Sequence, residues 1–352
     1  MNRAYFNALK VVEQVKEDTA YIIEVDTTLA GVSNSDQFQF TGAEGEYDVL
    51  AFQSGVQVAS FNNLVDEQTI TLPTGGLYEL RVIPRGIGFN KVRFDNSGDR
   101  LKLLKTLQWG DYGVNEPNQI GASWGCNNHS EIAGDGKWFA VVTDGERVFS
   151  ENSLTSLPSD MTLLNLTDGL RMFENNSLSS LPSNMSLPNL AVGSSMFFGN
   201  SLTSLPSDMT LLNLTSGASM FRSNNLASLP SGMTLQSLTN GASMFNSNNL
   251  ASLPSGMTLQ SLTNGRRMFE NNSLTSLPSG MTLPSLTNGA RMFQDNTINT
   301  ARYSQLLIDL EANNPNNNVE FHGGNSKYNA AGEIARNALT ARGWDITDGG
   351  LE

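Results

Sequence analysis

A cysteine and a histidine that stand three residues apart are the first candidates for chemistry in this chain. Cys126 is the only cysteine, and His129 and His322 are the only two histidines. A thiol beside an imidazole can act as nucleophile and base. Nothing else in the surrounding sequence completes a catalytic site, however. The favoured interpretation is that Cys126 fills an apolar position and that His129 occupies the turn after it, so no catalytic residue is assigned.

Two close pairs of aspartates could serve acid-base chemistry or bind a metal ion. Asp95 pairs with Asp99, and Asp345 with Asp348, but both pairs lie in turn-like sequence. Aspartate is common in turns because its side chain bonds the local backbone. A single cysteine leaves no thiolate cluster for zinc, and the glycines before Lys327 do not have the spacing of a phosphate-binding loop. The sequence therefore predicts no metal, no cofactor and no enzyme.

The charge balance bears on the kind of partner. The 352 residues carry a net charge of -13 with only 21 basic residues, which argues against nucleic acid because phosphate binding depends on Lys and Arg. No apolar stretch approaches the roughly 20 residues needed to cross a bilayer, so no membrane insertion is expected. The N-terminal segment predicts a short amphipathic helix and lacks the apolar core of a signal peptide. We expect a protein that is not exported.

A repeat of 24 residues runs from Phe149 to Phe293 without an insertion. Apolar residues that recur at identical positions predict stacked ladders inside a repeat protein. One predicted ladder contains Phe173, Phe197, Phe221, Phe245, Phe269 and Phe293. A second has asparagines whose amides would bond the backbone of the next turn: Asn152, Asn176, Asn200, Asn224, Asn248, Asn272 and Asn296. A recurring glycine, such as Gly169, predicts a positive φ or a close backbone approach.

The positions that vary between repeats are the candidates for binding. After the Met-Phe pairs stand Glu174, Phe198, Arg222, Asn246, Glu270 and Gln294, and Arg267 and Arg291 precede two of the pairs. Arginine and aromatic side chains are enriched in interfaces, although drift on an unconstrained surface explains the variation equally well. Between Glu151 and Asp295 the chain has seven acidic residues, five arginines and no lysine. Contacts here would rest on hydrogen bonds and shape.

Composition divides the chain into four predicted regions. Residues 1–20 form a helical attachment segment. Residues 21–100 alternate apolar and polar residues between turns, which predicts an all-β, sandwich-like domain. Residues 101–298 hold the repeats, with degenerate first copies. Residues 299–352 combine helical and strand patterns and predict a small α/β cap over the last repeat.

The repeat resembles a known family. The unit that contains Ser153-Leu154-Thr155-Ser156-Leu157-Pro158 and ends at Met172-Phe173 is similar to BspA-like leucine-rich repeats of bacterial surface and phage tail proteins. The segment Leu107-Gln108-Trp109-Gly110-Asp111 and the run from His322 to Gly350 are similar to that family's entry segment and C-terminal cap. Asn or Ser mostly precedes the ladder asparagine, where many members have Cys. The resemblance implies a multidomain fold built around a leucine-rich-repeat solenoid.

The resemblance also implies a function. Because the secretion signal of the cell-surface members is missing, we expect a component of a phage virion, in its tail or fibre. It would contact other virion proteins through its N-terminal region and present its repeats to a host surface protein or glycan. Further copies of the chain are candidate partners in a homo-oligomer. The alternative is a bacterial adhesin located at the cell surface.

Overall fold

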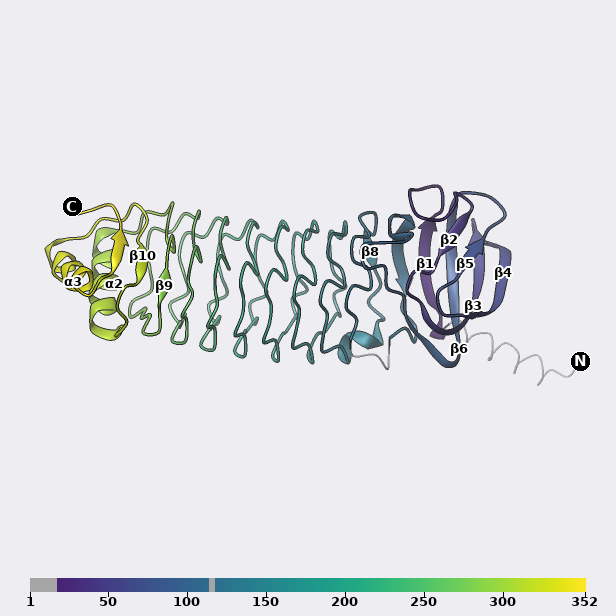
Figure 1. Cartoon of the computed structure of the whole chain (residues 1–352), viewed down its shortest axis with the longest axis horizontal. Helices are drawn as coiled ribbons and strands as arrows, with labels where there is room; N and C mark the ends of the chain where they lie inside the picture. The colour runs from purple at the N-terminus through teal and green to yellow at the C-terminus, as the bar shows by residue number, and fades with distance from the viewer. Residues whose placement is uncertain (1–17, 114–117) are drawn as a thin grey trace, which may run out of the picture. The chain divides into compact units, whose positions relative to one another are not determined.

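The computed structural model describes residues 18–113 and 118–352 (Figure 1). The helix predicted at the N-terminus falls on residues 1–17 and lies outside them. The chain divides into two compact units, one made of Met1–Leu163 and Asn175–Ser177, the other of Leu164–Glu174 and Leu178–Glu352. Within the described residues, no helix has the length and apolar character to span a bilayer.

The first unit is built around a six-stranded sheet. Its strands lie in the order β4-β3-β6-β1-β7-β8, and β2 and β5 form a separate two-stranded sheet. All contacts in the large sheet are antiparallel except that between β7 and β8. The strand bounds are β1 Tyr21–Asp26, β2 Gln37–Gln39, β3 Glu44–Gln53, β4 Val56–Val65, β5 Thr69–Thr71, β6 Leu77–Lys91, β7 Leu103–Gln108 and β8 Glu131–Ile132. Two 3-10 helices, η1 Arg100–Lys102 and η2 Lys137–Ala140, complete the unit.

Alternation along the strands places the core of this unit on one face of the large sheet. In β1 every second residue, beginning with Tyr21, is buried, as the two-residue period of a strand requires. The two-stranded sheet covers part of this face, because the ring of Phe40, directly after β2, lies 5.5 Å from the ring of Tyr47 in β3. Aromatic contacts of this kind add to the free energy gained by burial.

A buried ion pair holds the long connection between β1 and β2. Asp99 and Lys102 have fully buried side chains, with 3.5 Å between carboxylate and ammonium. Asp99 accepts from the N–H groups of Val32 and Gln39 at 2.9 and 2.7 Å. Lys102 donates to three backbone carbonyls in residues 33–37 at 2.9 to 3.1 Å. Because a charge buried in protein is tolerated only when it is paired and hydrogen-bonded, this network fixes the loop to η1.

The repeats in the second unit form stacked coils of irregular backbone, visible as successive turns in teal and green in Figure 1. Each coil bonds the next through backbone groups 23 to 25 residues apart. The N–H of Phe197, for example, donates to Met220 O at 2.9 Å, and that of Gly217 to Asn240 O at 2.9 Å. Single parallel bridges link Asp168, Val192, Ser216, Asn240, Asn264 and Asn288 in order.

The core of the coils consists of ladders of identical side chains. The rings of successive phenylalanines from Phe173 to Phe293 lie 5.5 to 5.7 Å apart and within 9° of parallel. The leucine and methionine positions of each coil are also buried. Burial of apolar side chains contributes roughly 25 cal/mol per Å², and each coil gains it only from its neighbours.

The C-terminal part of the second unit contains two α-helices. They are α2 Thr300–Asn313 and α3 Ala330–Ala341, and β10 Glu320–His322, β11 Asp345–Thr347 and β9 Asn288–Gly289 form a parallel sheet in the order β11-β10-β9. Asn299 and Asn329 cap the two helices through their side chains, as expected of asparagine. Since β9 belongs to the last repeat, the sheet continues it, and Phe321 of β10 packs against Phe293.

The predicted fold class is wrong. The structure has mixed sheets, 11% helix and 21% strand, whereas a leucine-rich repeat carries a strand and a helix or 3-10 turn in every copy. Between η2 and β9 the chain has no such element. The prediction of a sandwich-like N-terminal domain is also wrong, because one six-stranded sheet faces a sheet of only two short strands. The physical reason for the strandless coils is local: each one holds a proline and two residues with positive φ, so extended pairing is interrupted after single bridges.

Candidate functional site

The ladder asparagines are structural, and each one from Asn176 to Asn296 bonds two coils. The side chain of Asn200 donates to Phe173 O at 2.9 Å and accepts from Leu178 N–H at 3.0 Å. The same pattern recurs at Asn224 and the later asparagines. Buried backbone groups without a partner cost free energy, and these amides remove that cost in every coil. Asn152, at the start of the ladder, is buried but has no side-chain partner.

The recurring glycines lie in tight packing and lack a positive φ. A Cβ added to Gly193 would come within 3.0 Å of the sulfur of Met220, and one added to Gly217 within 3.1 Å of that of Met244. The left-handed conformation falls two residues later, where Ser195 and Ser219 have φ of 56° and 57°. A turn there lets the N–H of Ser195 reach Ala218 O at 2.8 Å.

The variable column is defined as Glu174, Phe198, Arg222, Asn246, Glu270 and Gln294. Four of its six members contact another member of the column instead of pointing freely into solvent. The guanidinium of Arg222 lies 5.5 Å from the centre of the Phe198 ring. Asn246, which is 5% exposed, donates to the carboxylate of Glu270, which is 9% exposed, at 2.8 Å. A binding partner would have to displace these contacts before it could use the side chains.

Arginines beside the column are the more accessible candidates. Arg171, Arg266 and Arg291 are exposed, and Arg267 is half-buried. Arg267 lies 3.6 Å from Glu270, and Arg171 lies 3.8 Å from Glu174. Because ion pairs of an exposed arginine contribute little to stability, Arg171 can exchange its partner at small cost, whereas Arg267 and Glu270 are both largely buried. The structure thus brings the predicted column and Arg267 together, and leaves Arg291 exposed at the same position of the last coil.

Cys126 and His129 are not accessible to a substrate in solution. Both side chains are fully buried. Burial raises the pKa of the Cys126 thiol, which disfavours the reactive thiolate. Burial lowers the pKa of His129 to about 3, and its Nε2 lies 3.1 Å from the hydroxyl of Thr106. His322 is half-buried, and its Nδ1 accepts from Gly324 N–H at 3.0 Å.

The aspartate pairs are held in separate structural contacts. Asp99 belongs to the buried pair with Lys102, and Asp95 lies 3.0 Å from Arg93. Asp348 accepts from Arg336 at 2.8 Å and from the Tyr303 hydroxyl at 3.0 Å. Burial and the neighbouring carboxylate of Asp348 raise the pKa of Tyr303. Within residues 18–113 and 118–352, no group of three or more His, Cys, Asp or Glu side chains could hold a metal ion.

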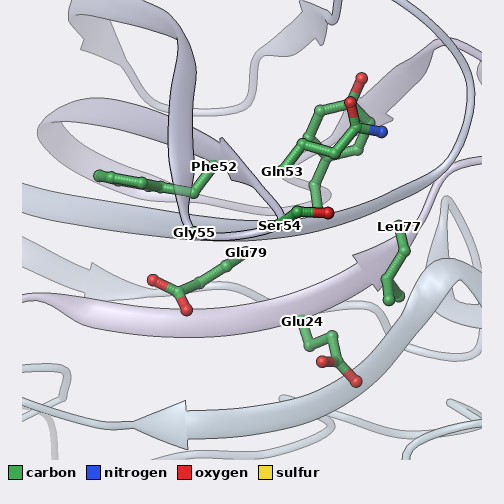
Figure 2. A pocket seen from close by; sticks show the side chains of 8 residues that line it. Glu24, Phe52, Gln53, Ser54, Gly55, Leu77 and Glu79 are labelled. Atoms are coloured by element: carbon green, nitrogen blue, oxygen red, sulfur yellow. The ribbon is translucent and has the colours of Figure 1, made fainter.

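One hollow in the first unit brings polar and aromatic groups together. Its volume is about 590 Å³. Figure 2 shows the carboxylates of Glu24 and Glu79 on adjacent strands, beneath the turn at Ser54 and Gly55. The hollow is lined by Glu24, Phe52, Gln53, Ser54, Gly55, Leu77, Tyr78 and Glu79. Such a set can accept hydrogen bonds from hydroxyl or ammonium groups.

The carboxylates of the hollow already have cationic partners. Glu24 and Glu79 stand directly opposite in the β1–β6 register, an arrangement that is unfavourable for like charges. Lys105 lies 3.5 Å from Glu24, and Arg81 lies 2.6 Å from Glu79. The Arg81 guanidinium also stacks 4.2 Å from the centre of the Phe52 ring. A ligand here would compete with Lys105 and Arg81.

Sequence reasoning did not identify this hollow. Its residues come from β1, the β3–β4 hairpin and the start of β6, so no local spacing links them. The one signal in the sequence was the alternation that places Glu24 between the buried residues Ile23 and Val25. This alternation predicts that the Glu24 carboxylate faces outward, but it does not identify the residue opposite it in the sheet.

Comparison with known proteins adds no identification. No family model matches the sequence, and a search of curated proteins gives no match. The resemblance of the repeats to BspA-like proteins stays an expectation from the residues themselves.

Proposed function

We propose that this protein is a non-enzymatic structural and adhesion component of a phage virion, in its tail or fibre. Its stacked coils present a polar surface to a host surface protein or glycan, and its N-terminal region contacts other virion proteins. The observation that carries the proposal is the way the repeats use their side chains. The invariant residues bond one coil to the next, and the variable ones remain at the surface or just below it.

The interior of the coils supports a scaffold role. Phenylalanine, methionine and leucine positions are buried in each repeat, and the ladder asparagines satisfy backbone groups of two coils at once. Side chains committed to such contacts are not free to bind substrate. Repeat proteins of this kind use their stacked units as a support for an extended binding surface.

The outer surface of the coils supports contact with a neutral, hydroxyl-rich partner. Seven acidic residues, five arginines and no lysine between Glu151 and Asp295 leave Ser, Thr and Asn as the main surface types. Such groups bind through hydrogen bonds of defined geometry and give little long-range steering. The phage setting itself rests on the resemblance of the repeats and flanking segments to BspA-like phage tail proteins.

The binding part of the proposal can be tested with cells of the host. Purified, fluorescently labelled protein is titrated onto the cells, and the double variant Arg266→Ala/Arg291→Ala is compared with it. Loss of these two exposed arginines, which lie beside the variable column, should weaken binding at least about tenfold. The matched control is Arg302→Ala, an exposed arginine on α2. Equal binding by all three proteins would remove this face from the account.

A further inference from the structure

A polar hollow lies inside the second unit, where the last coils meet the C-terminal cap. Its volume is about 400 Å³. Asn325 comes from the cap, and the other lining residues come from the last coils. Besides Leu274 and two ladder asparagines, the lining residues are Ser273, Thr275, Asp295, Thr297 and Asn325.

The backbone on the cap side of the hollow is fixed to the last coil. Asn325 N–H donates to Asn296 O at 2.8 Å, and Asn325 O accepts from Gly349 N–H at 2.9 Å. A Cβ added to Gly324 would lie 2.5 Å from Asn296 O, so the segment approaches the coil this closely because it has glycine there. The hollow is therefore formed before a ligand arrives, which lowers the entropy cost of binding.

The polar groups of the hollow are available to a ligand. The hydroxyls of Ser273, Thr275 and Thr297 are exposed and make no hydrogen bond within the described residues, and the same holds for the side-chain amide of Asn325. Asp295 is also exposed, and the only hydrogen bond of its carboxylate to a described residue is a 3.5 Å contact with the adjacent glutamine. The hollow of the first unit differs, because its two carboxylates have cationic partners.

The lining groups fit a neutral ligand that carries several hydroxyls. The Asp295 carboxylate accepts hydrogen bonds, the Asn325 amide donates and accepts them, and the hydroxyls can do either. Asp295 is the one charged residue of the lining, so a phosphate or sulfate would be repelled. Leu274, the one apolar lining residue, is buried. The hollow thus offers no apolar surface to a peptide side chain or a lipid tail.

We infer that this hollow binds a neutral saccharide unit, whose hydroxyls donate to Asp295 and exchange hydrogen bonds with Asn325 and the three hydroxyl side chains. The inference rests on the proposed function, in which the coils contact a host protein or glycan. It selects the glycan and places the contact beside the cap. Because the lining contains no aromatic ring, a single sugar unit should bind weakly, with a Kd on the order of 1 mM.

Saturation-transfer NMR of the full chain tests the inference with methyl glycosides of glucose, galactose, mannose, rhamnose, N-acetylglucosamine and N-acetylgalactosamine. At least one should give a saturable signal. Asp295→Gly should raise its Kd at least about tenfold, because a hydrogen bond to a charged group is lost. Glycine freely adopts the φ of 58° found at this position. The matched control is Asn175→Gly, at the same position of an earlier coil with a φ of 52°, and it should leave the Kd unchanged.

A second variant on the cap side makes the test independent of the carboxylate. Asn325→Ala should raise the Kd at least about threefold, as expected for the loss of neutral hydrogen bonds. No signal from any of the glycosides, or an unchanged Kd in Asp295→Gly, would overturn the inference. Binding of glucosamine alone, lost in Asp295→Gly, would also overturn it, because the site would then select an ammonium group. These outcomes leave the proposed place of the protein in the particle unaffected, since that is measured on purified virions.

Discussion

Each ladder asparagine from Asn176 to Asn296 satisfies backbone groups in two coils, so its loss should leave two buried backbone groups unpaired. Asn224→Ala removes the donor to Phe197 O and the acceptor of Leu202 N–H. We expect the free energy of unfolding to fall by about 2 to 6 kcal/mol, since each of the two unsatisfied buried groups costs about 1 to 3 kcal/mol. Denaturant unfolding followed by circular dichroism measures it.

Two controls separate the hydrogen bonds from the mere loss of an amide. Asn225→Ala changes the exposed neighbour and should have little effect. Asn152→Ala removes a buried asparagine whose side chain has no partner, so it should destabilise much less than Asn224→Ala. Equal losses for Asn152→Ala and Asn224→Ala would show that the ladder bonds are not the reason for the asparagines.

The left-handed turn before each Met-Phe pair gives a second residue-scale prediction. Ser219 has a φ of 57°, where a β-branched side chain is strained. Ser219→Val should lower the free energy of unfolding by about 1 to 2 kcal/mol, whereas Ser219→Gly should not lower it, because glycine adopts this conformation freely. Thermal unfolding of the two variants, measured side by side, distinguishes them. A valine variant as stable as the glycine variant would refute the conformational account.

His129 should make the first unit sensitive to acid. Its pKa in the folded state is lowered to about 3 by burial, against 6.5 for an exposed histidine. The unfolded chain therefore binds a proton that the folded chain does not, and the stability present above pH 6.5 is lost as the pH falls towards 3. Relative to His129→Gln, the unmodified protein should lose up to about 1.4 kcal/mol per pH unit between pH 6 and 4. A difference in unfolding free energy that is constant with pH would contradict this.

At the scale of elements, the loop between β1 and β2 depends on one buried ion pair. Lys102→Met leaves the Asp99 carboxylate buried without its cation, and the first unit should lose about 3 to 5 kcal/mol of stability. Fluorescence of the buried Trp109 and Trp138 during urea unfolding reports on this unit when Trp344 of the second unit is replaced by Phe in every protein compared. Lys137→Met, which breaks an exposed pair with Asp111, is the control and should change stability by no more than about 1 kcal/mol.

The elements that sequence could predict are those with strong local periodicity. Alternation in β1 and the helical patterns of α2 and α3 are properties of short segments. The coils show the limit of this reasoning. Their ladders follow from the 24-residue period, but the conformation between ladder positions is set by turns at Ser195 and its equivalents. Nothing in a serine indicates a positive φ, so the prediction of a leucine-rich-repeat solenoid was wrong.

The candidate site illustrates the same limit at the residue scale. The variable column could be located by comparing repeats, because its position within each copy is fixed. The sequence could not show whether these side chains are free to bind. The contact of Arg222 with Phe198 and that of Asn246 with Glu270 depend on which residues are neighbours in the stack. The pairing of Glu24 with Glu79 depends on a sheet register that no local pattern encodes.

At the scale of the whole molecule, the two units differ in architecture. Coils of nearly neutral surface belong to the second unit, and the six-stranded sheet belongs to the first. Under the proposed function, the coils would contact the host and the N-terminal region would contact other virion proteins.

The central claim is that this protein is a part of the phage particle, and its amount in purified particles tests that claim most directly. Virions are banded by density from lysates of cells that encode the chain, and the protein is quantified by mass spectrometry against the major capsid protein. We predict a fixed ratio to capsid protein across the virion band that survives washing in high salt. Protein that stays in the cell fraction, or is washed from the particles, would contradict the account.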